Sequence, residues 1–284
     1  MAAHPLALIV FADIDGVLSA SPPDQLACDL RQLHGLGPSV ALVLCSGRTR
    51  PEIEHLAHAL GIRHPFICEH GAAAFVPDGY FPFDVPNALP VAGYQVVEFG
   101  RSAASVVEAL RRVAERQGVA LRLFSEMRVD EVAQECGMTP LDARLAKLRD
   151  YGEMFRTVDR DDQTRARLLE GLRGAHLRCV TGTPFDHAGA TVDISIGVGM
   201  LRTLYRRAYG ATVTVGIADW RADGDVLQLV ECPVIVESAS GASATRSGRR
   251  GGNTRVVTLD RRGNWAAAIV DFVREQHPAA VVTG

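Results

Sequence analysis

Two aspartates stand two residues apart, directly after an apolar segment near the start of the chain. Residues 6–11 (LALIVF) have the unbroken hydrophobic pattern of a buried parallel strand, and Asp13 and Asp15 follow it. Ligands of open α/β sheets bind beyond the carboxyl ends of the strands, where these carboxylates are expected. Burying either one without a partner is costly, which predicts a cation or a basic group nearby. The alternative is that both are solvated residues of the turn that ends the strand.

A second apolar segment ends in residues that suit an anion. Residues 40–45 (VALVLC) predict another buried strand, which is followed by Ser46, Gly47 and Arg48. Pro51 stands where a helix could begin. A strand, a Ser-Gly turn and a helix N-terminus together offer backbone N–H groups and a hydroxyl to an anion such as phosphate. Taken alone, Ser46 could equally be an ordinary helix N-cap.

The elements that must position these residues alternate between strand and helix patterns. Further buried strands are predicted at 65–68, 212–218 and 232–237, and helices at 25–36, 52–60, 197–209 and 265–276. Residues 94–181 follow the order β-α-β-α-α-β-α-β, which predicts a separate antiparallel sheet. We therefore expect a doubly wound (Rossmannoid) α/β core from residues 1–85 and 190–284, with an α+β cap domain inserted at 86–189.

Composition narrows the class of protein. The chain has 284 residues, of which 47% are hydrophobic and 22% charged, as in ordinary soluble globular proteins. A net charge of −3 gives no reason to expect a nucleic-acid partner. The apolar segment after residue 5 is too short for a signal peptide or a membrane span, and the six cysteines form no C-x-x-C pair. We expect a cytoplasmic protein with no membrane partner. Lys147 is the only lysine in the chain.

Residues 13–18 (DIDGVL) resemble the first motif of the haloacid dehalogenase superfamily, whose members are mostly Mg²⁺-dependent phosphatases. Longer stretches resemble mannosyl-3-phosphoglycerate phosphatases, which have a cap of type IIB: residues 45–54 (CSGRTRPEIE), 60–72 (LGIRHPFICEHGA), segments between 124 and 151, and 182–187 (GTPFDH). The likeness covers most of residues 6–237. It implies a phosphatase that acts on a small phosphorylated metabolite of the sugar or glycerate type.

The resemblance also implies roles for individual residues. In the family the first aspartate is the phosphorylated nucleophile and the second the general acid/base, which are Asp13 and Asp15 here. The remaining implied positions are phosphate contacts at Ser46, Gly47 and Arg48, substrate contacts at Thr49, Arg50, His187 and Arg221, and metal ligands at Asp13, Asp15, Asp219 and Asp223. Four carboxylates around a phosphate repel one another, and Mg²⁺, the implied cofactor, offsets part of that repulsion.

Four positions depart from the family pattern. The family lysine that neutralises nucleophile and phosphate aligns with Ile194, and three further residues aligned with family side chains are Ala222 (an asparagine), Pro184 (an arginine) and His70 (an asparagine). Loss of one preorganised charged donor typically costs roughly 10²–10³ in rate. We expect an impaired enzyme unless Arg48 or Arg221 supplies the charge. The side chain of Ile194 is expected to point into the carboxylates, with burial in the core as the alternative. His70 is expected to be a structural histidine.

Two classes of function compete. The first is a Mg²⁺-dependent phosphatase that works through an aspartyl-phosphate, and the four retained aspartates favour it. The second is a catalytically degenerate protein of the same fold that binds a sugar phosphate or a protein partner, which the residues at 184, 194 and 222 favour. Altered chemistry on the same scaffold is a third, lesser alternative.

Overall fold

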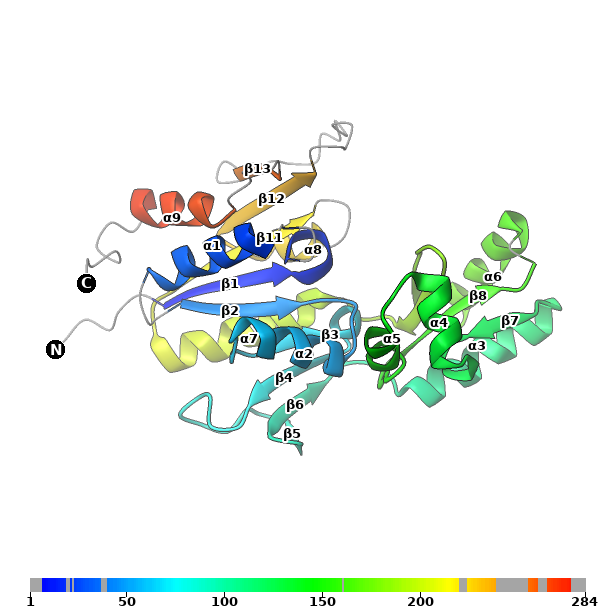
Figure 1. The fold of residues 1–284 in the computed structure, drawn as a ribbon. Coiled ribbons are helices and arrows are strands. Elements are labelled where there is room, and N and C mark those ends of the chain that lie inside the picture. Colours follow the sequence, from blue (N-terminus) through cyan, green and yellow to red (C-terminus); the bar gives the residue numbers. More distant parts are fainter. Residues whose placement is uncertain are drawn as a thin grey trace.

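The chain forms a large mixed sheet with helices on both faces and a smaller antiparallel sheet beside it (Figure 1). The computed structural model describes residues 7–18, 21, 23–36, 40–159, 161–219, 224–238, 255–259 and 265–276. Within these residues, no helix is long and apolar enough to cross a membrane.

Among the described residues, the large sheet has nine strands. Six neighbours are parallel, in the order β13 (Arg255–Leu259), β12 (Cys232–Ser238), β11 (Thr212–Asp219), β1 (Ala7–Asp13), β2 (Val40–Cys45) and β3 (Phe66–Cys68). Three antiparallel strands extend the β3 edge, namely β4 (Ala73–Pro77), β6 (Tyr94–Glu98) and β5 (Leu89–Val91). The predicted α/β fold class is confirmed.

Burial on both faces explains the unbroken hydrophobic pattern of β1. Leu8, Val10 and Ala12 face one apolar cluster, whereas Ile9 and Phe11 face another. The first cluster includes residues of α1 (Pro23–His34), α2 (Arg50–Leu60) and α9 (Trp265–Gln276), and the second includes residues of α7 (Ile194–Tyr209) and α8 (Gly224–Leu227). A central strand covered in this way can carry no polar side chain before its end, so its first available polar position is Asp13.

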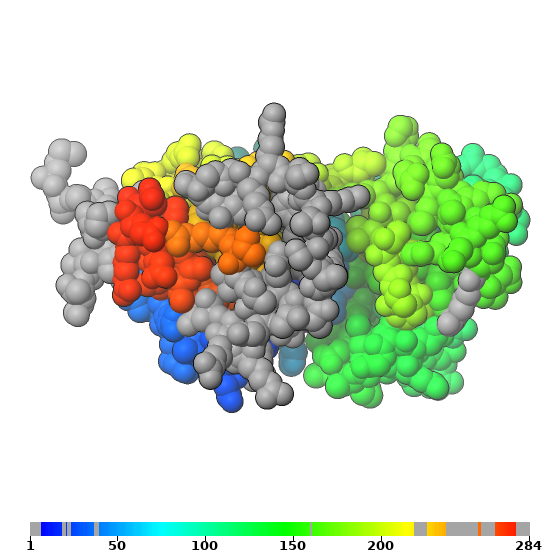
Figure 2. Space-filling model, turned by 90° about the horizontal axis from the view of Figure 1, so that it is seen from above, coloured from blue at the N-terminus to red at the C-terminus, as the bar shows by residue number. Residues whose placement is uncertain are grey.

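The smaller sheet has the strand order β7 (Leu121–Leu123), β8 (Gly152–Thr157), β10 (Asp186–Ala190) and β9 (Leu177–Val180). One apolar cluster joins it to α3 (Ala103–Gln117) and α6 (Asp162–Gly174), and another joins it to α4 (Val129–Cys136) and α5 (Pro140–Ala146). In Figure 2, these green segments form a body at the opposite end from the orange and red β13 and α9. The expected antiparallel layer is therefore present.

One part of the expected insert lies elsewhere. Strands β5 and β6, inside the predicted range 86–189, pair with the large sheet and not with the small one: β6 runs antiparallel to β4, with Ala73 opposite Glu98. The error arose because the Gly- and Pro-rich residues before β6 indicate a linker, although they form the turns of an antiparallel extension. The division into two domains stays a prediction.

A buried carboxylate joins the first and last helices of the large sheet. Asp29 of α1 is fully buried, and one of its oxygens accepts the backbone N–H of Ala266, near the start of α9, at 3.3 Å. Burial raises the pKa of Asp29 to about 6, although hydrogen bonds from Ala266 and Gln25 oppose the rise. At neutral pH the fold therefore carries a buried charge that is only partly compensated.

The substitution Asp29→Asn keeps an acceptor for Ala266 and removes this charge. Because the folded pKa of about 6 lies above the usual value of 3.8, the folded state holds the proton more tightly, and the associated stability is lost as pH rises through that window. We expect the stability of the wild type relative to Asp29→Asn to fall by about 1–2 kcal/mol between pH 4 and pH 7. Urea unfolding at both pH values measures the difference, and a difference independent of pH would contradict this account.

Candidate active site

The first aspartate is fixed at the carboxyl end of β1. Asp13 is the last residue of that strand and is only 4% exposed. Its two oxygens accept the backbone N–H groups of Asp15 at 3.1 Å and of Gly16 at 2.9 Å, in the tight turn Ile14–Leu18. These bonds fix the orientation of the carboxyl group.

The second aspartate has the basic partner that the sequence predicts. Asp15 is exposed, and its Oδ1 accepts a hydrogen bond from Arg48 Nε at 2.7 Å. Its Oδ2 accepts the hydroxyl proton of Ser46, also at 2.7 Å, and Ser46 is fully buried. Because Asp13 lies opposite Cys45 in the pairing of β1 with β2, the residues after both strands meet at one edge of the sheet. The structure thus brings Asp13, Asp15, Ser46 and Arg48 together.

The predicted metal ligands are only partly described. Asp219 ends β11, the other neighbour of β1, so its backbone reaches the same edge of the sheet as Asp13. The side chain of Asp219 and residues 220–223, which include Arg221, Ala222 and Asp223, lie outside the described residues. Among the described ones, no group of three or more His, Cys, Asp or Glu side chains is arranged to hold a metal. The carboxylates of Asp13 and Asp15 nevertheless fit Mg²⁺ as hard oxygen donors.

Two predicted substrate contacts are engaged in the structure of α2. Thr49 is the buried N-cap: its Oγ1 accepts the N–H of Glu52 at 3.3 Å, and Glu52 Oε2 accepts the N–H of Thr49 at 2.8 Å. The guanidinium of Arg50 approaches Glu54 at 3.5 Å and lies 6.0 Å from the centre of the Phe75 ring. Their roles as substrate contacts stay predictions.

A cavity of about 770 Å³ opens beside Asp15, between the loop after β2 and the elements of the small sheet. Its volume suits a small metabolite. From the large-sheet side, Asp15, Gly47, Arg48, His55 and His70 are among its lining residues. From the other side, Thr139, Arg149, Thr181, Pro184 and His187 line it. Of the phosphate-contact candidates, Gly47 and Arg48 therefore share one cavity with His187, and the buried Ser46 does not line it. Arg50 lines a separate cavity of about 320 Å³.

Two of the residues that line the cavity are histidines in contact with each other. His70 follows β3 and His187 belongs to β10, and their ring centroids are 4.6 Å apart. Burial lowers the pKa of His70 to about 4, aided by Arg149 and Arg178, and burial lowers the pKa of His187 well below its usual range. Both rings are therefore neutral at neutral pH. Gly47 is required here, because a Cβ at this position would lie 2.2 Å from the ring of His70.

A buried ion pair behind the loop was not found by sequence reasoning. Glu69 and Arg149 have side chains that are 1% and 9% exposed, and they approach to 3.3 Å. Glu69 also accepts the N–H groups of Asp150 at 2.8 Å and Tyr151 at 3.2 Å. Burial raises the pKa of Glu69, and Arg149 opposes that rise. One feature of the sequence could have predicted this ion pair: a glutamate stands directly after the apolar strand at 66–68, and a carboxylate buried there must have a partner.

Ile194, the first residue of α7, lies in the apolar core. It is 2% exposed and belongs to the apolar cluster that contains Phe11, Ile67 and Val198. The expectation that its side chain points into the carboxylates is thereby corrected, and the alternative of a core residue is the one that the packing supports. Lys147 does not replace the family lysine that neutralises nucleophile and phosphate, because its Nζ bonds to the backbone carbonyls of Phe124 and Met127.

The packing of Ile194 predicts the effect of restoring the family residue. Ile194→Lys should lower the free energy of unfolding by about 2–4 kcal/mol, because it places a charge among apolar side chains. It should not raise any phosphatase activity. Ile194→Met, the control of similar volume, should cost less than about 1.5 kcal/mol. Urea unfolding with parallel assays checks this, and a stable, more active lysine variant would contradict the packing argument.

Comparison with known proteins places these features in context. No family model matches the chain. It is 29% identical to the glucosyl-3-phosphoglycerate/mannosyl-3-phosphoglycerate phosphatase of Methanococcoides burtonii over 241 residues, 82% of this chain and 86% of that one. It is also 29% identical to the mannosyl-3-phosphoglycerate phosphatase of Pyrococcus horikoshii over 231 residues, 81% of this chain and 90% of that one.

Solved structures share the fold. A haloacid dehalogenase-like hydrolase from Bacteroides thetaiotaomicron superposes with a TM-score of 0.61 at 13% identity, covering 95% of this chain and 99% of that one. A sugar phosphatase of subclass IIB of the HAD superfamily superposes with a TM-score of 0.57, also at 13% identity, covering 97% of this chain and all of the other. The resemblance stated from the sequence motifs is confirmed.

Proposed function

We propose that the chain hydrolyses the phosphate ester of a small sugar or glycerate derivative, with Asp13 as nucleophile, which its similarity to mannosyl-3-phosphoglycerate phosphatases supports. The observation that carries the proposal is the hydrogen-bonded group of Asp13, Asp15, Ser46 and Arg48 beside a metabolite-sized cavity, which Asp15 and Arg48 line. A cytoplasmic location and a cap formed around the small sheet remain part of the proposal.

The proposed reaction has two steps. A carboxylate oxygen of Asp13 bonds to phosphorus while the ester P–O bond breaks, and Asp15 gives its proton to the leaving alcohol. Asp15 then takes a proton from water, which attacks phosphorus and releases phosphate from Asp13. The N–H of Gly47 holds a phosphoryl oxygen, and Arg48 adds positive charge. Ser46, the other predicted phosphate contact, donates its one hydroxyl proton to Asp15, so its role here is to orient that carboxyl group.

Arg48 is the described residue that best replaces the missing lysine charge. It already bonds to Asp15 and lines the cavity. Its planar guanidinium can engage a carboxylate and a phosphate oxygen at once, which a lysine would do with a different geometry. Mg²⁺, when bound by Asp13, Asp15, Asp219 and Asp223, would supply the remaining charge that offsets repulsion between phosphate and carboxylates.

The nature of the leaving group is proposed from the cavity wall. Thr49, Arg50, His187 and Arg221 remain the proposed substrate contacts, and His187 lines the cavity. Thr181, Thr183 and Pro184 line the same wall with uncharged side chains. The relatives are named for glycosyl-3-phosphoglycerates, which carry a glycerate carboxylate. Because Pro184 stands here in place of the family arginine, this wall has one fewer positive charge to bind that carboxylate. A sugar phosphate without the glycerate carboxylate is therefore the better first substrate to test.

A degenerate protein that only binds a sugar phosphate is the second candidate. The burial of Ile194 favours it, because no lysine charge reaches the carboxylates from that position. The two candidates predict the same ligand and differ in turnover, which the next experiment measures.

Asp13→Asn should abolish turnover of p-nitrophenyl phosphate in the presence of Mg²⁺, by at least about 10³-fold, because an amide cannot attack phosphorus. The amide oxygen can still accept one of the two N–H groups that Asp13 binds, those of Asp15 and Gly16, and only the other bond is lost. The melting temperature should therefore fall only modestly. A wild-type rate no higher than that of Asp13→Asn would favour the degenerate protein instead, and substantial residual activity in the variant would exclude Asp13 as nucleophile.

Mg²⁺ should stabilise the folded chain by mass action, because only the folded state brings the aspartates together. At 100 times the dissociation constant the expected gain is about 2.7 kcal/mol, visible as a higher melting temperature. Asp219→Ala should lose this shift, and NaCl at equal ionic strength controls for screening. Identical melting curves for the wild type with and without Mg²⁺ would contradict the metal site.

A further inference from the structure

The segment 145–151 of the chain contacts the loop after β2 from behind. Thr49 Oγ1 lies 3.0 Å from the carbonyl oxygen of Leu145. Arg149 donates to the carbonyl of Gly47 from both terminal nitrogens, at 3.0 and 3.2 Å. The ion pair of Arg149 with Glu69 completes the contact. The segment that follows α5 is therefore part of the support of the proposed phosphate loop.

The peptide group between Gly47 and Arg48 is held at both ends. Its carbonyl accepts the two bonds from Arg149, and its N–H donates to Ser46 Oγ at 3.0 Å. Ser46 has one hydroxyl proton, and it donates that proton to Asp15 Oδ2 at 2.7 Å. An unbroken series of hydrogen bonds thus runs from Arg149 through this peptide and Ser46 to Asp15.

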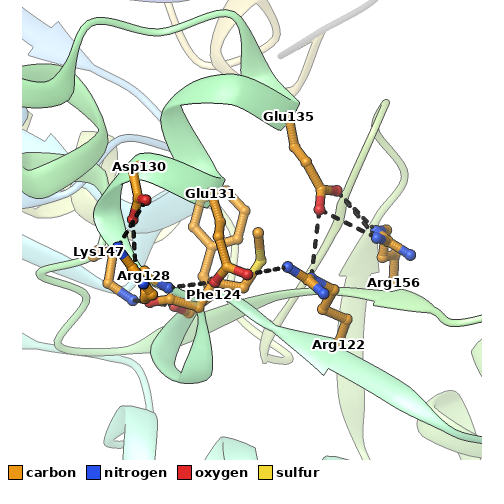
Figure 3. A network of polar contacts seen from close by, with 9 residues as sticks. Arg122, Phe124, Arg128, Asp130, Glu131, Glu135, Lys147 and Arg156 are labelled. Atoms are coloured by element: carbon orange, nitrogen blue, oxygen red, sulfur yellow. Dashed lines mark hydrogen bonds and ion pairs between the residues drawn. The ribbon is translucent and has the colours of Figure 1, made fainter.

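Arg149 acts on this series from a fixed position. Its side chain is nearly buried, and its terminal nitrogens bond to Gly47 and Glu69. Two residues earlier, Lys147 fastens the same segment to the turn that carries Phe124, as Figure 3 shows. A buried guanidinium with two N–H groups directed at one carbonyl can fix the orientation of a peptide plane, as Arg149 does for the Gly47–Arg48 peptide. A flexible side chain on a mobile segment could not.

We propose that Arg149 is a positioning residue that aims the carboxyl group of Asp15 through the Gly47–Arg48 peptide and the hydroxyl of Ser46. This inference rests on the proposed function, in which Asp15 protonates the leaving group. Arg149 belongs to the segment next to the small sheet, so the placement of that segment against the loop sets the aim of the acid.

Two aryl phosphates test the proposal, because general-acid catalysis matters more for a poor leaving group than for a good one. Arg149→Met should lower kcat for phenyl phosphate about tenfold more than kcat for p-nitrophenyl phosphate, and KM should change little. Arg149→Lys, which keeps the charge and loses the fork, should show a smaller loss of the same kind. Asp15→Asn gives the ratio for complete loss of the acid.

Arg144→Met is the matched control, since Arg144 is an exposed arginine of α5. It should leave the ratio of the two rates unchanged. Equal losses on both substrates in Arg149→Met and Arg149→Lys, or a change in KM alone, would overturn the proposal in favour of a structural or substrate-binding role. If Arg149→Met does not fold, the comparison passes to Arg149→Lys and Glu69→Gln, which keep most of the buried contacts.

Hydrogen exchange of the Arg48 amide gives a readout that does not depend on turnover. Its N–H bonds to Ser46 Oγ, and loss of the Arg149 fork should speed its exchange by about tenfold at constant global stability. An unchanged exchange rate would overturn the proposed series of bonds even if activity falls. A wild type that hydrolyses neither ester would refute the proposed function, and the exchange measurement would then still decide whether Arg149 holds the loop.

Discussion

Negative charge at the carboxyl end of β1 is the constraint on which the site depends. Asp13 and Asp15 stand at one edge of the sheet, and a phosphate brought to them would add to their charge. The structure answers with directed donors. Two backbone N–H groups hold Asp13, whereas a buried hydroxyl and a guanidinium hold Asp15. Such fixed dipoles compensate charge without reorganising during a reaction, which makes them suited to stabilising a transition state.

Sequence reasoning predicted the parts of this arrangement that follow from local pattern. Unbroken apolar segments located β1 and β2, because strands covered on both faces leave no room for alternation. The largely apolar residues 212–218 located β11. Polar residues directly after such strands must lie at the binding edge of the sheet, so the grouping of Asp13, Asp15, Ser46 and Arg48 was expected before the structure. The helix at 265–276 was predicted with its observed bounds.

Contacts that depend on tertiary packing could not be predicted in the same way. The pairing of β6 with β4 depends on how an antiparallel extension folds back, and Gly- and Pro-rich turns look like a linker in the sequence. Glu69 and Arg149 lie 80 residues apart in the chain, and no local pattern relates them. Alignment with family motifs located Ile194, but the direction of its side chain follows from the seating of α7 on the sheet.

The basic side chains of the described site are arginines, in a chain that has a single lysine. A lysine at the start of α7 would be a point charge on a flexible stem, and the packed isoleucine leaves that position to the core. Positive charge enters instead through Arg48 at Asp15 and through Arg149 behind Gly47. Guanidinium groups place several donors in one plane, so they can fix a carboxylate and a peptide together. The carboxylate of Asp15 is thus held by side chains of the loop after β2, and that loop is held in turn by Arg149.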